Sequence, residues 1–283
     1  MGRNDELVRS VQSRRATARE PLEEERLDVR AVNRVAWDRR VAAGNPWTVP
    51  VGPEEIAHVR SGGLRIVLTP TRPVPRDWFP PLSGADILCL ASGGGQQAPL
   101  LAATGARVTV LDNSPQQLAQ DRSVAEREDL EIRTVEGDMR DLGAFSAETF
   151  DLIVHPVSNC FVPDVRSVWR EAYRVLRPGG VLLAGFCNPI MYLFDPAAEA
   201  RGELTVRFTI PYSDLTDIAA EERARHYGED GAIEFGHTLE DQIGGQIEVG
   251  FVIHGFYEDR SPGEILAKHI AHFIATKAIK PVA

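Results

Sequence analysis

The stretch ILCLASGGGQQAPLLAATGARVTVLDNS, residues Ile87 to Ser114, decides the fold of this chain. Apolar residues typical of a buried strand lead into three glycines, a helix-like segment and a second strand that ends at Asp112. Glycine is favoured where a side chain would hold a ligand away from the backbone, and the start of a helix offers free N–H groups. Asp112 can accept hydrogen bonds from both hydroxyls of a ribose. The stretch therefore predicts a nucleoside site.

Strand and helix patterns alternate along most of the chain, which is typical of a parallel sheet flanked by helices. Thr238, followed three positions later by Asp241, predicts a helix start near the end of the chain. An amphipathic helix is predicted from apolar residues three and four apart, which are Val165, Val168, Trp169, Ala172, Val175 and Leu176. The expected strands are residues 85–92, 107–112, 131–138, 151–156 and 180–186, with two final strands at 251–257 and 272–279.

The regions outside this alternation predict a cover and a cap. Residues 1–30 mix Arg and Glu and hold few large apolar residues, which predicts a flexible charged tail. Residues 31–81, rich in tryptophan and proline, are expected to form a helical and irregular N-terminal cover. Residues 189–235 are expected to form an inserted cap with a half-buried strand at 204–210. The core then comprises residues 82–188 and 236–283.

The composition of the chain limits the kinds of molecule that it is expected to bind. The 283 residues carry a formal net charge of −10, which argues against a nucleic-acid partner. No apolar run is long enough to span a bilayer, and the polar N-terminus does not resemble a signal peptide, so we expect a cytoplasmic protein without a membrane partner. The three cysteines, Cys89, Cys160 and Cys187, are far apart in the sequence and are expected to be reduced thiols.

Two classes of cofactor fit the glycine loop. Gly93, Gly95 and Ala98 satisfy the G-x-G-x-x-A fingerprint of dinucleotide sites, which keeps a nicotinamide cofactor open. The sequence VEGDM favours a different nucleoside, because Asp138 at the end of the third strand could accept a hydrogen bond from an adenine amino group. Met139 could then pack on the adenine ring.

With these motifs in order, the sequence resembles the class I S-adenosylmethionine-dependent methyltransferases, in particular the type 11 group that acts on small molecules. The resemblance covers residues 83–188 well, through LASGGGQ, VTVLDNS, EGDM, FDLIVHPVSN and EAYRVLRPGGVLLAGF. It implies an α/β fold with a Rossmann-like seven-stranded, mostly parallel sheet of order 3-2-1-4-5-7-6, whose last strand is antiparallel. It also implies S-adenosyl-L-methionine as cofactor and S-adenosyl-L-homocysteine as product.

The sequence departs from the family at the glycine loop. Loops of this family commonly carry an acidic residue two positions before the first glycine, whereas this chain reads CLASGGG, and we expect water, Ser92 or the backbone to make that contact. The resemblance places cofactor contacts at the glycine loop, Asp112 and Asp138. Together with the residues beside them and at the end of the fourth strand, the expected cofactor-binding residues are Ala91, Ser92, Gly93, Gly94, Gly95, Asp112, Asn113, Gly137, Asp138, Met139 and His155.

The acceptor site is expected where the fourth strand, the cover and the cap meet. His155 follows the apolar LIV of the fourth strand and is our candidate catalytic base, with a cofactor contact or a structural hydrogen bond as the alternatives. Trp37, Trp47 and Tyr212 could form an aromatic lid over a cationic sulfur or simply pack the cap. The candidate acceptor-binding residues are Trp37, Trp47, Asn159, Cys160, Tyr212 and His237. We predict no metal site, because no cluster of carboxylates converges at the carboxyl ends of the strands.

We therefore expect methyl transfer from S-adenosylmethionine to a small molecule by in-line displacement, without a metal. The alternatives are a nicotinamide-dependent oxidoreductase and a non-catalytic regulator that binds S-adenosylmethionine. The sequence leaves open whether the acceptor atom is oxygen, nitrogen, sulfur or carbon, and whether the protein is a homodimer.

Overall fold

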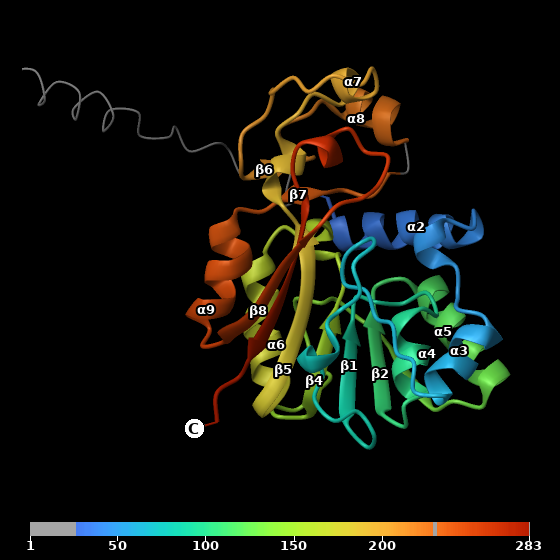
Figure 1. Cartoon of the computed structure of the whole chain (residues 1–283). Helices are drawn as coiled ribbons and strands as arrows, with labels where there is room; N and C mark the ends of the chain where they lie inside the picture. Colours follow the sequence, from blue (N-terminus) through green and yellow to red (C-terminus); the bar gives the residue numbers. More distant parts are fainter. Residues whose placement is uncertain (1–26, 229–230, 283) are drawn as a thin grey trace, which may run out of the picture.

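A computed structural model describes residues 27–228 and 231–282 of the chain (Figure 1). Most of the predicted tail, residues 1–26, lies outside the described residues. Within residues 27–228 and 231–282, none of the helices combines the length and the apolar composition that a membrane span needs.

One seven-stranded sheet organises the molecule, and its strand order is β3-β2-β1-β4-β5-β9-β8. The strands are β1 (Asp86–Leu90), β2 (Arg107–Asp112), β3 (Ile132–Glu136), β4 (Phe150–His155), β5 (Leu176–Cys187), β8 (Val252–Asp259) and β9 (Phe273–Ile279). The first five are parallel, and β9 runs antiparallel to both of its neighbours, β5 and β8. Counting only the strands of this sheet in chain order gives 3-2-1-4-5-7-6 with an antiparallel last strand, so the predicted fold is confirmed.

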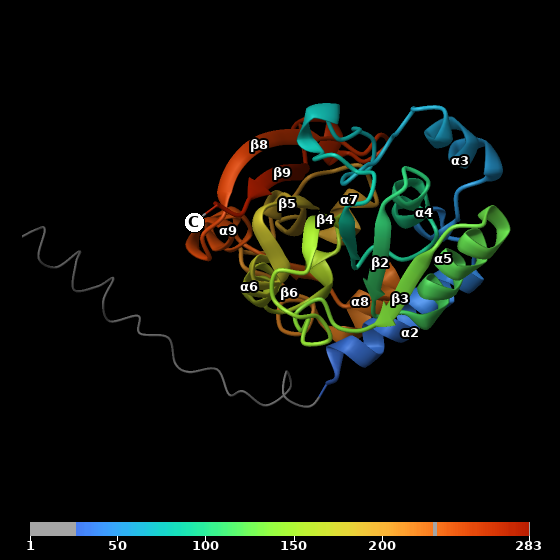
Figure 2. The same ribbon diagram turned by 90° about the horizontal axis from the view of Figure 1, so that it is seen from below.

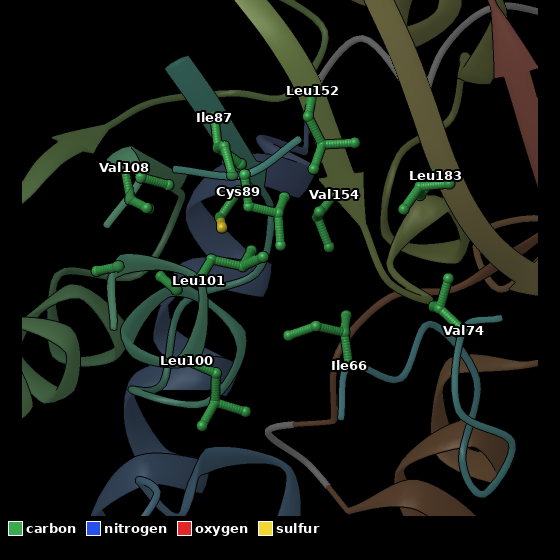
Figure 3. Close-up of a cluster of buried hydrophobic side chains, with 14 of the residues drawn as sticks. Ile66, Val74, Ile87, Cys89, Leu100, Leu101, Val108, Leu152, Val154 and Leu183 are labelled. Atoms are coloured by element: carbon green, nitrogen blue, oxygen red, sulfur yellow. The ribbon is translucent and has the colours of Figure 1, made fainter. Parts of the chain in front are cut away.

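Strand β1 is buried on both faces, which explains its unbroken run of apolar residues. Side chains alternate along a strand, so Ile87 and Cys89 join one apolar cluster while Leu88 and Leu90 join another on the opposite face. Figure 3 shows the first cluster, in which Leu101 packs against the side chains of β1 and its neighbours. The central strand therefore holds the two halves of the core together.

Helices cover both faces of the sheet (Figure 2). One face carries α3 (Pro53–Arg60), α4 (Gln97–Ala102) and α5 (Pro115–Glu128), and the other carries α6 (Val165–Val175) and α9 (Gly245–Glu248). The predicted stripe of α6 is buried along its whole length. The Asp164 carboxylate starts this helix by accepting hydrogen bonds from the N–H groups of Arg166 and Ser167.

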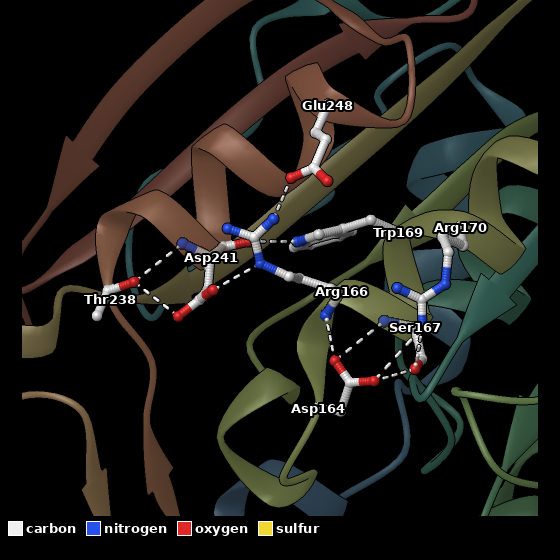
Figure 4. Close-up of polar contacts among 8 residues, drawn as sticks. All are labelled: Asp164, Arg166, Ser167, Trp169, Arg170, Thr238, Asp241 and Glu248. Atoms are coloured by element: carbon white, nitrogen blue, oxygen red, sulfur yellow. Dashed lines mark hydrogen bonds and ion pairs between the residues drawn. The ribbon is translucent and has the colours of Figure 1, made fainter. Parts of the chain in front are cut away.

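A polar cluster joins α6 to the segment before α9 (Figure 4). The N–H of Asp241 donates to Thr238 Oγ1 at 3.0 Å, at the predicted helix start, and Asp241 itself lies in a π-helical turn, η5 (Glu240–Gly244). Trp169 Nε1 donates to the Asp241 carbonyl at 3.0 Å, and Arg166 pairs with the Asp241 carboxylate at 2.7 Å. These contacts fix the last part of the chain against the first part of the core.

The N-terminal cover begins with α2 (Val29–Ala42), which lies above the carboxyl ends of the strands and beside α5 (Figures 1 and 2). Two short helical turns follow at η1 (Pro46–Thr48) and η2 (Arg76–Trp78). Asp38 of α2 accepts a hydrogen bond from Ser114 Oγ at 2.6 Å, at the start of α5. The cover is thus tied directly to the end of β2.

The segment between β5 and η5 lies above the same edge of the sheet (Figure 1). It contains η4 (Pro189–Tyr192), α7 (Pro196–Glu199), α8 (Ala220–Tyr227) and a two-stranded sheet formed by β6 (Tyr212–Ser213) and β7 (Phe235–Gly236). The strand predicted at 204–210 is wrong. The N–H groups of Arg207 and Phe208 both donate to the Leu193 carbonyl, so the segment bends around one acceptor, and Val206 makes only an isolated bridge.

Substitution of the fully buried Trp169 tests the packing of α6 against the core. Trp169→Ala should lower the free energy of unfolding by about 3–5 kcal/mol, because it removes a large core side chain and leaves the Asp241 carbonyl without its donor. Chemical denaturation measures the loss. The matched control is Phe256→Ala on β8, whose side chain is 52% exposed and whose removal should cost less than about 1 kcal/mol. Equal losses in the two variants would contradict the packing described.

Candidate functional site

A cavity of about 490 Å³ opens at the carboxyl ends of the strands, beneath α2 and the inserted segment. Its floor comes from residues that follow β1, β2, β3, β4 and β5 and from the start of β9. This is the edge of a parallel sheet at which ligands bind, because every strand delivers a loop there. We call the part at the carboxyl ends of β1, β2 and β3 the cofactor half. The part lined by Trp37, Cys160, Phe161, Cys187, Met191, Glu234 and Phe273 is the acceptor half.

The glycine loop borders the cofactor half. Its Gly93 N–H donates to Asp112 Oδ2 at 2.9 Å, and Ser114 N–H donates to Asp112 Oδ1 at 2.9 Å, so this carboxylate joins the ends of β1 and β2. A Cβ atom at Gly93 would lie 2.7 Å from the Cβ of Gln117. Gly94 has a φ of +106°, in the left-handed region that favours glycine. Only a chain without side chains at these positions fits between β1 and α5.

A buried carboxyl group that was not predicted from the sequence holds this loop on the side away from the cavity. Asp121 of α5 is fully buried, and its two oxygens accept hydrogen bonds from the N–H groups of Gly94 and Gly95, both at 3.1 Å. The sequence does carry a signal for it, because Asp121 is three positions from both Leu118 and Val124 on the apolar face of α5. A charged residue on the buried stripe of a helix requires polar partners.

The predicted adenosine contacts gather in the same half of the cavity. Asp112, Asn113, Gly137, Asp138 and Met139 all line it. Burial raises the pKa of Asp112, although the N–H groups of Ser114 and Gly93 partly offset this effect.

Asp138, the predicted adenine acceptor, forms an ion pair with Arg140, whose Nη2 lies 2.7 Å from Asp138 Oδ2. Burial acts to raise the pKa of Asp138, but the hydrogen bonds and charge of Arg140 outweigh it and lower that pKa. The carboxylate is therefore held in one orientation and kept ionised. Arg140, which also lines the cavity, was not predicted.

Three buried polar atoms of the cavity wall have no hydrogen-bond partner in the described part of the chain. They are Ser92 Oγ, Gln97 Oε1 and Gln117 Oε1, all beside the glycine loop. A buried polar group without a partner is rare and costly, and a polar ligand that supplies the missing bonds explains it. These atoms, together with the close approach of backbone at Gly93, fit a polar nucleoside cofactor.

Apolar and aromatic groups dominate the acceptor half. Trp37 of α2 packs edge-on against Phe161 with ring centroids 5.3 Å apart, and the guanidinium carbon of Arg40 lies 4.5 Å from the Trp37 centroid. Cys160 and Cys187 line the wall below them. A hydrogen bond with Cys187, together with burial, raises the pKa of the Cys160 thiol, so this thiol is neutral near pH 7. Trp47, at the glycine-loop side, also lines the cavity and is 52% exposed.

One side chain, that of Asn33, joins three segments at the roof of the cavity. Asn33 of α2 is buried, and its Nδ2 donates to the carbonyls of Phe161 at 3.0 Å and of Ile233 at 3.1 Å. The N–H of Ile233 donates back to Asn33 Oδ1 at 2.7 Å. One amide thus joins the N-terminal cover, the loop after β4 and the inserted segment.

His155 lies behind the wall, and the structure does not bring it to the cavity. Its ring is fully buried, with Nδ1 2.8 Å from the Leu90 carbonyl oxygen and Nε2 2.6 Å from Asn159 Oδ1. Burial lowers its pKa, so the ring is neutral near pH 7. This position is that of the structural hydrogen bond, which was one of the alternatives raised for this residue.

Asn159, Tyr212 and His237 also lie outside the cavity lining. His237 Nε2 donates to the Val162 carbonyl at 2.9 Å, and the Tyr212 hydroxyl donates to Asp214 at 2.8 Å. Among the described residues no group of three or more His, Cys, Asp or Glu side chains is arranged to hold a metal ion. Sequence position alone did not separate these supporting residues from those that line the cavity.

Comparisons with known proteins agree with this architecture. Residues 88–184 match a family described as "Methyltransferase domain". The chain is 52% identical over 250 residues to a Bacillus subtilis protein named uncharacterized methyltransferase YbaJ, which covers 88% of this chain and 98% of that protein. It is 27% identical over 184 residues to a ubiquinone biosynthesis O-methyltransferase of Xanthomonas oryzae, which covers 63% of this chain and 72% of that protein.

The fold is also similar to that of solved structures. An S-adenosylmethionine dependent methyltransferase from Mesorhizobium loti superposes with a TM-score of 0.55 at 22% sequence identity. The superposition covers 72% of this chain and 94% of that chain. At this identity the likeness concerns the fold.

Because the Asp121 carboxyl is buried, we expect the free energy of unfolding to depend on pH. Burial, and then the charge of Asp112, raise the pKa of Asp121 to about 8, against the two glycine N–H bonds that lower it. A carboxyl whose pKa is higher in the folded state binds its proton more tightly there, so it contributes stability at acid pH that is lost as pH rises toward 8. Asp121→Asn should remove this loss. Between about pH 4 and 8, the free energy of unfolding of the parent should therefore fall more steeply than that of Asp121→Asn, by about 1.4 kcal/mol for each pH unit.

Denaturant unfolding of the parent and of Asp121→Asn at several pH values between about 4 and 8 measures this difference. Glu126→Gln, on the exposed side of the same helix, is the matched control and should follow the parent. Parallel curves for the parent and Asp121→Asn would show that this carboxyl does not titrate in the folded state as described.

Proposed function

Since the chain belongs to the S-adenosylmethionine-dependent methyltransferase family, with S-adenosylmethionine as its methyl donor, we propose that it methylates a small molecule held in the acceptor half of the cavity. The observation that carries the proposal is that one cavity joins the cofactor half to the acceptor half without an intervening wall. The relative from Xanthomonas oryzae is named an O-methyltransferase, which favours an oxygen acceptor.

Different residues of the cofactor half bind different parts of the cofactor. Asp112 accepts hydrogen bonds from the ribose, Asp138 and Met139 contact the adenine, and the backbone at Ala91–Gly93 approaches the remainder of the cofactor. Ser92, Gln97 and Gln117 gain the partners that they lack. When bound, S-adenosylmethionine supplies a methyl group on a positively charged sulfur.

The acceptor half orients the acceptor and excludes water. Trp37 and Phe161 form an aromatic corner against which a small apolar or aromatic molecule can pack, and α2 covers it from above. Holding two reactants in line lowers the barrier of a displacement, by about 7–11 kcal/mol in the best cases. The neutral thiol of Cys160 adds no competing nucleophile near pH 7.

Ligand binding and product analysis test the proposal together. Calorimetry should give binding of S-adenosylhomocysteine and none of NAD. Incubation with methyl-labelled S-adenosylmethionine should transfer label to a member of a panel of small phenols, amines and thiols. Binding of NAD in place of S-adenosylhomocysteine, or cofactor binding without transfer to any member of the panel, would contradict it.

Gln117 gives a sharper test of the cofactor half. Gln117→Met keeps the length of the side chain and removes the unpartnered Oε1, so the unfolding free energy should stay the same or rise by up to about 1 kcal/mol. The same change should weaken binding of S-adenosylhomocysteine about tenfold, because one hydrogen bond is lost. Gln116→Met, its exposed neighbour, is the control for both measurements. Unchanged affinity in Gln117→Met would exclude Gln117 from the cofactor site.

A further inference from the structure

Glu234, immediately before β7, carries a carboxylate into the acceptor half of the cavity. Its Oε2 accepts a hydrogen bond from the Tyr192 hydroxyl at 3.0 Å, and its backbone N–H donates to Asp214 Oδ2 at 2.9 Å. In the part of the chain that the structure describes, no donor lies within hydrogen-bond distance of Oε1. The side chain is thus fixed at one oxygen and offers the other.

Resting on the methyl transfer proposed above, we propose that Glu234 is the catalytic base, which takes the proton of an acceptor hydroxyl at Oε1 while Tyr192 positions its carboxylate.

The surroundings of Glu234 suit a base that works near neutral pH. Burial, and then the charge of Asp214, raise its pKa to about 6, while the Tyr192 hydrogen bond and the positive charge of Arg40 act in the opposite direction. The carboxylate form is therefore available above pH 6 and close enough in pKa to the working pH to exchange a proton. The titratable and charged groups that face it are Arg40, Cys160, Cys187, Tyr192, Asp214 and Tyr227.

The other titratable groups near the cavity are already engaged. The carboxylate of Asp112 holds two backbone N–H groups, and that of Asp138 is paired with Arg140. Glu264 lies 2.9 Å from His272 Nε2, and its side chain is 46% exposed, so it does not provide a dry site. His155 lies behind the wall.

The proton and electron changes balance without a further reactant. Glu234 Oε1 takes the hydroxyl proton, and the electron pair released on the acceptor oxygen forms the new bond to the methyl carbon. The carbon–sulfur bond breaks with its pair left on sulfur, which becomes neutral. Because a carboxylate becomes a carboxylic acid in the same step, no charge is left unpaired in the apolar acceptor half.

Two measurements on the full chain test the inference, and the probes are phenol, catechol and hydroquinone. Single-turnover methylation of the probe that the parent accepts should rise with pH through about 6, and Glu234→Gln should lower it at least about 100-fold and abolish the rise. Calorimetry of phenol binding, with S-adenosylhomocysteine present, should give a parent affinity that strengthens about threefold to tenfold as the carboxyl ionises, and no such change in Glu234→Gln.

Two further variants separate a base from a structural residue. Tyr192→Phe should move the midpoint of the pH profile upward, because the lost hydrogen bond acts to lower the Glu234 pKa. Glu203→Gln makes the same chemical change at an exposed position between η4 and β6 and should behave as the parent.

The outcomes are distinct. The same rate, phenol affinity and pH dependence in Glu234→Gln and the parent would overturn the inference. So would a parent that binds S-adenosylhomocysteine but neither binds nor methylates any of the three probes. Failure of the parent to bind S-adenosylhomocysteine would instead overturn the proposed function itself.

Discussion

The Asp121 carboxyl group beneath the glycine loop is the constraint on which the site depends. Gly94 and Gly95 adopt positive φ, and their N–H groups turn away from the cavity toward this one side chain. With the loop held from below, Gly93 can reach Asp112, and the first two strands present a continuous edge. Gly94 and Gly95, predicted as cofactor contacts, are thus absent from the cavity lining because their N–H groups are already bonded to Asp121. Asp121 does not line the cavity, so it supports the loop and does not replace the acidic residue that the sequence lacks before the glycines.

The roof depends on a second buried polar contact. Asn33 bonds to backbone groups of the loop after β4 and of the inserted segment, so a single amide closes three segments over the cavity. The cover and the inserted segment are therefore joined above the cavity by hydrogen bonds to buried backbone groups.

The sheet and the cofactor half could be predicted from the sequence, whereas the acceptor half could not. Buried parallel strands produce apolar runs, and each run ends at the edge where ligands bind, so Asp112, Asp138 and Met139 could be located without coordinates. His155 satisfied the same rule but lies against the Leu90 carbonyl and Asn159. Its neighbours come from the adjacent strand and a later turn, and a one-dimensional pattern does not specify on which side of the wall a ring packs.

Glu234 and Tyr212 illustrate the same limit in the inserted segment. Both lie in a region with few regular elements, where long-range contacts rather than periodicity decide orientation. Tyr212, predicted to face the ligand, donates its hydroxyl to Asp214, while Glu234, which no motif marked, lines the cavity. The alternation of apolar and polar residues at 204–210 predicted a strand for a related reason. A long-range contact decides this segment too, because its backbone bends around the Leu193 carbonyl.

In the proposed reaction, one cavity aligns a methyl donor with an acceptor beside Glu234. A crystal structure of the full chain with S-adenosylhomocysteine and a bound phenol would test this arrangement. We expect the ribose hydroxyls on Asp112, and the phenol oxygen between the cofactor sulfur and Glu234 Oε1, with hydrogen-bond contact to that oxygen of about 2.6–3.2 Å. A cofactor whose sulfur faces away from the acceptor half, or a phenol oxygen with no contact to Glu234, would contradict it.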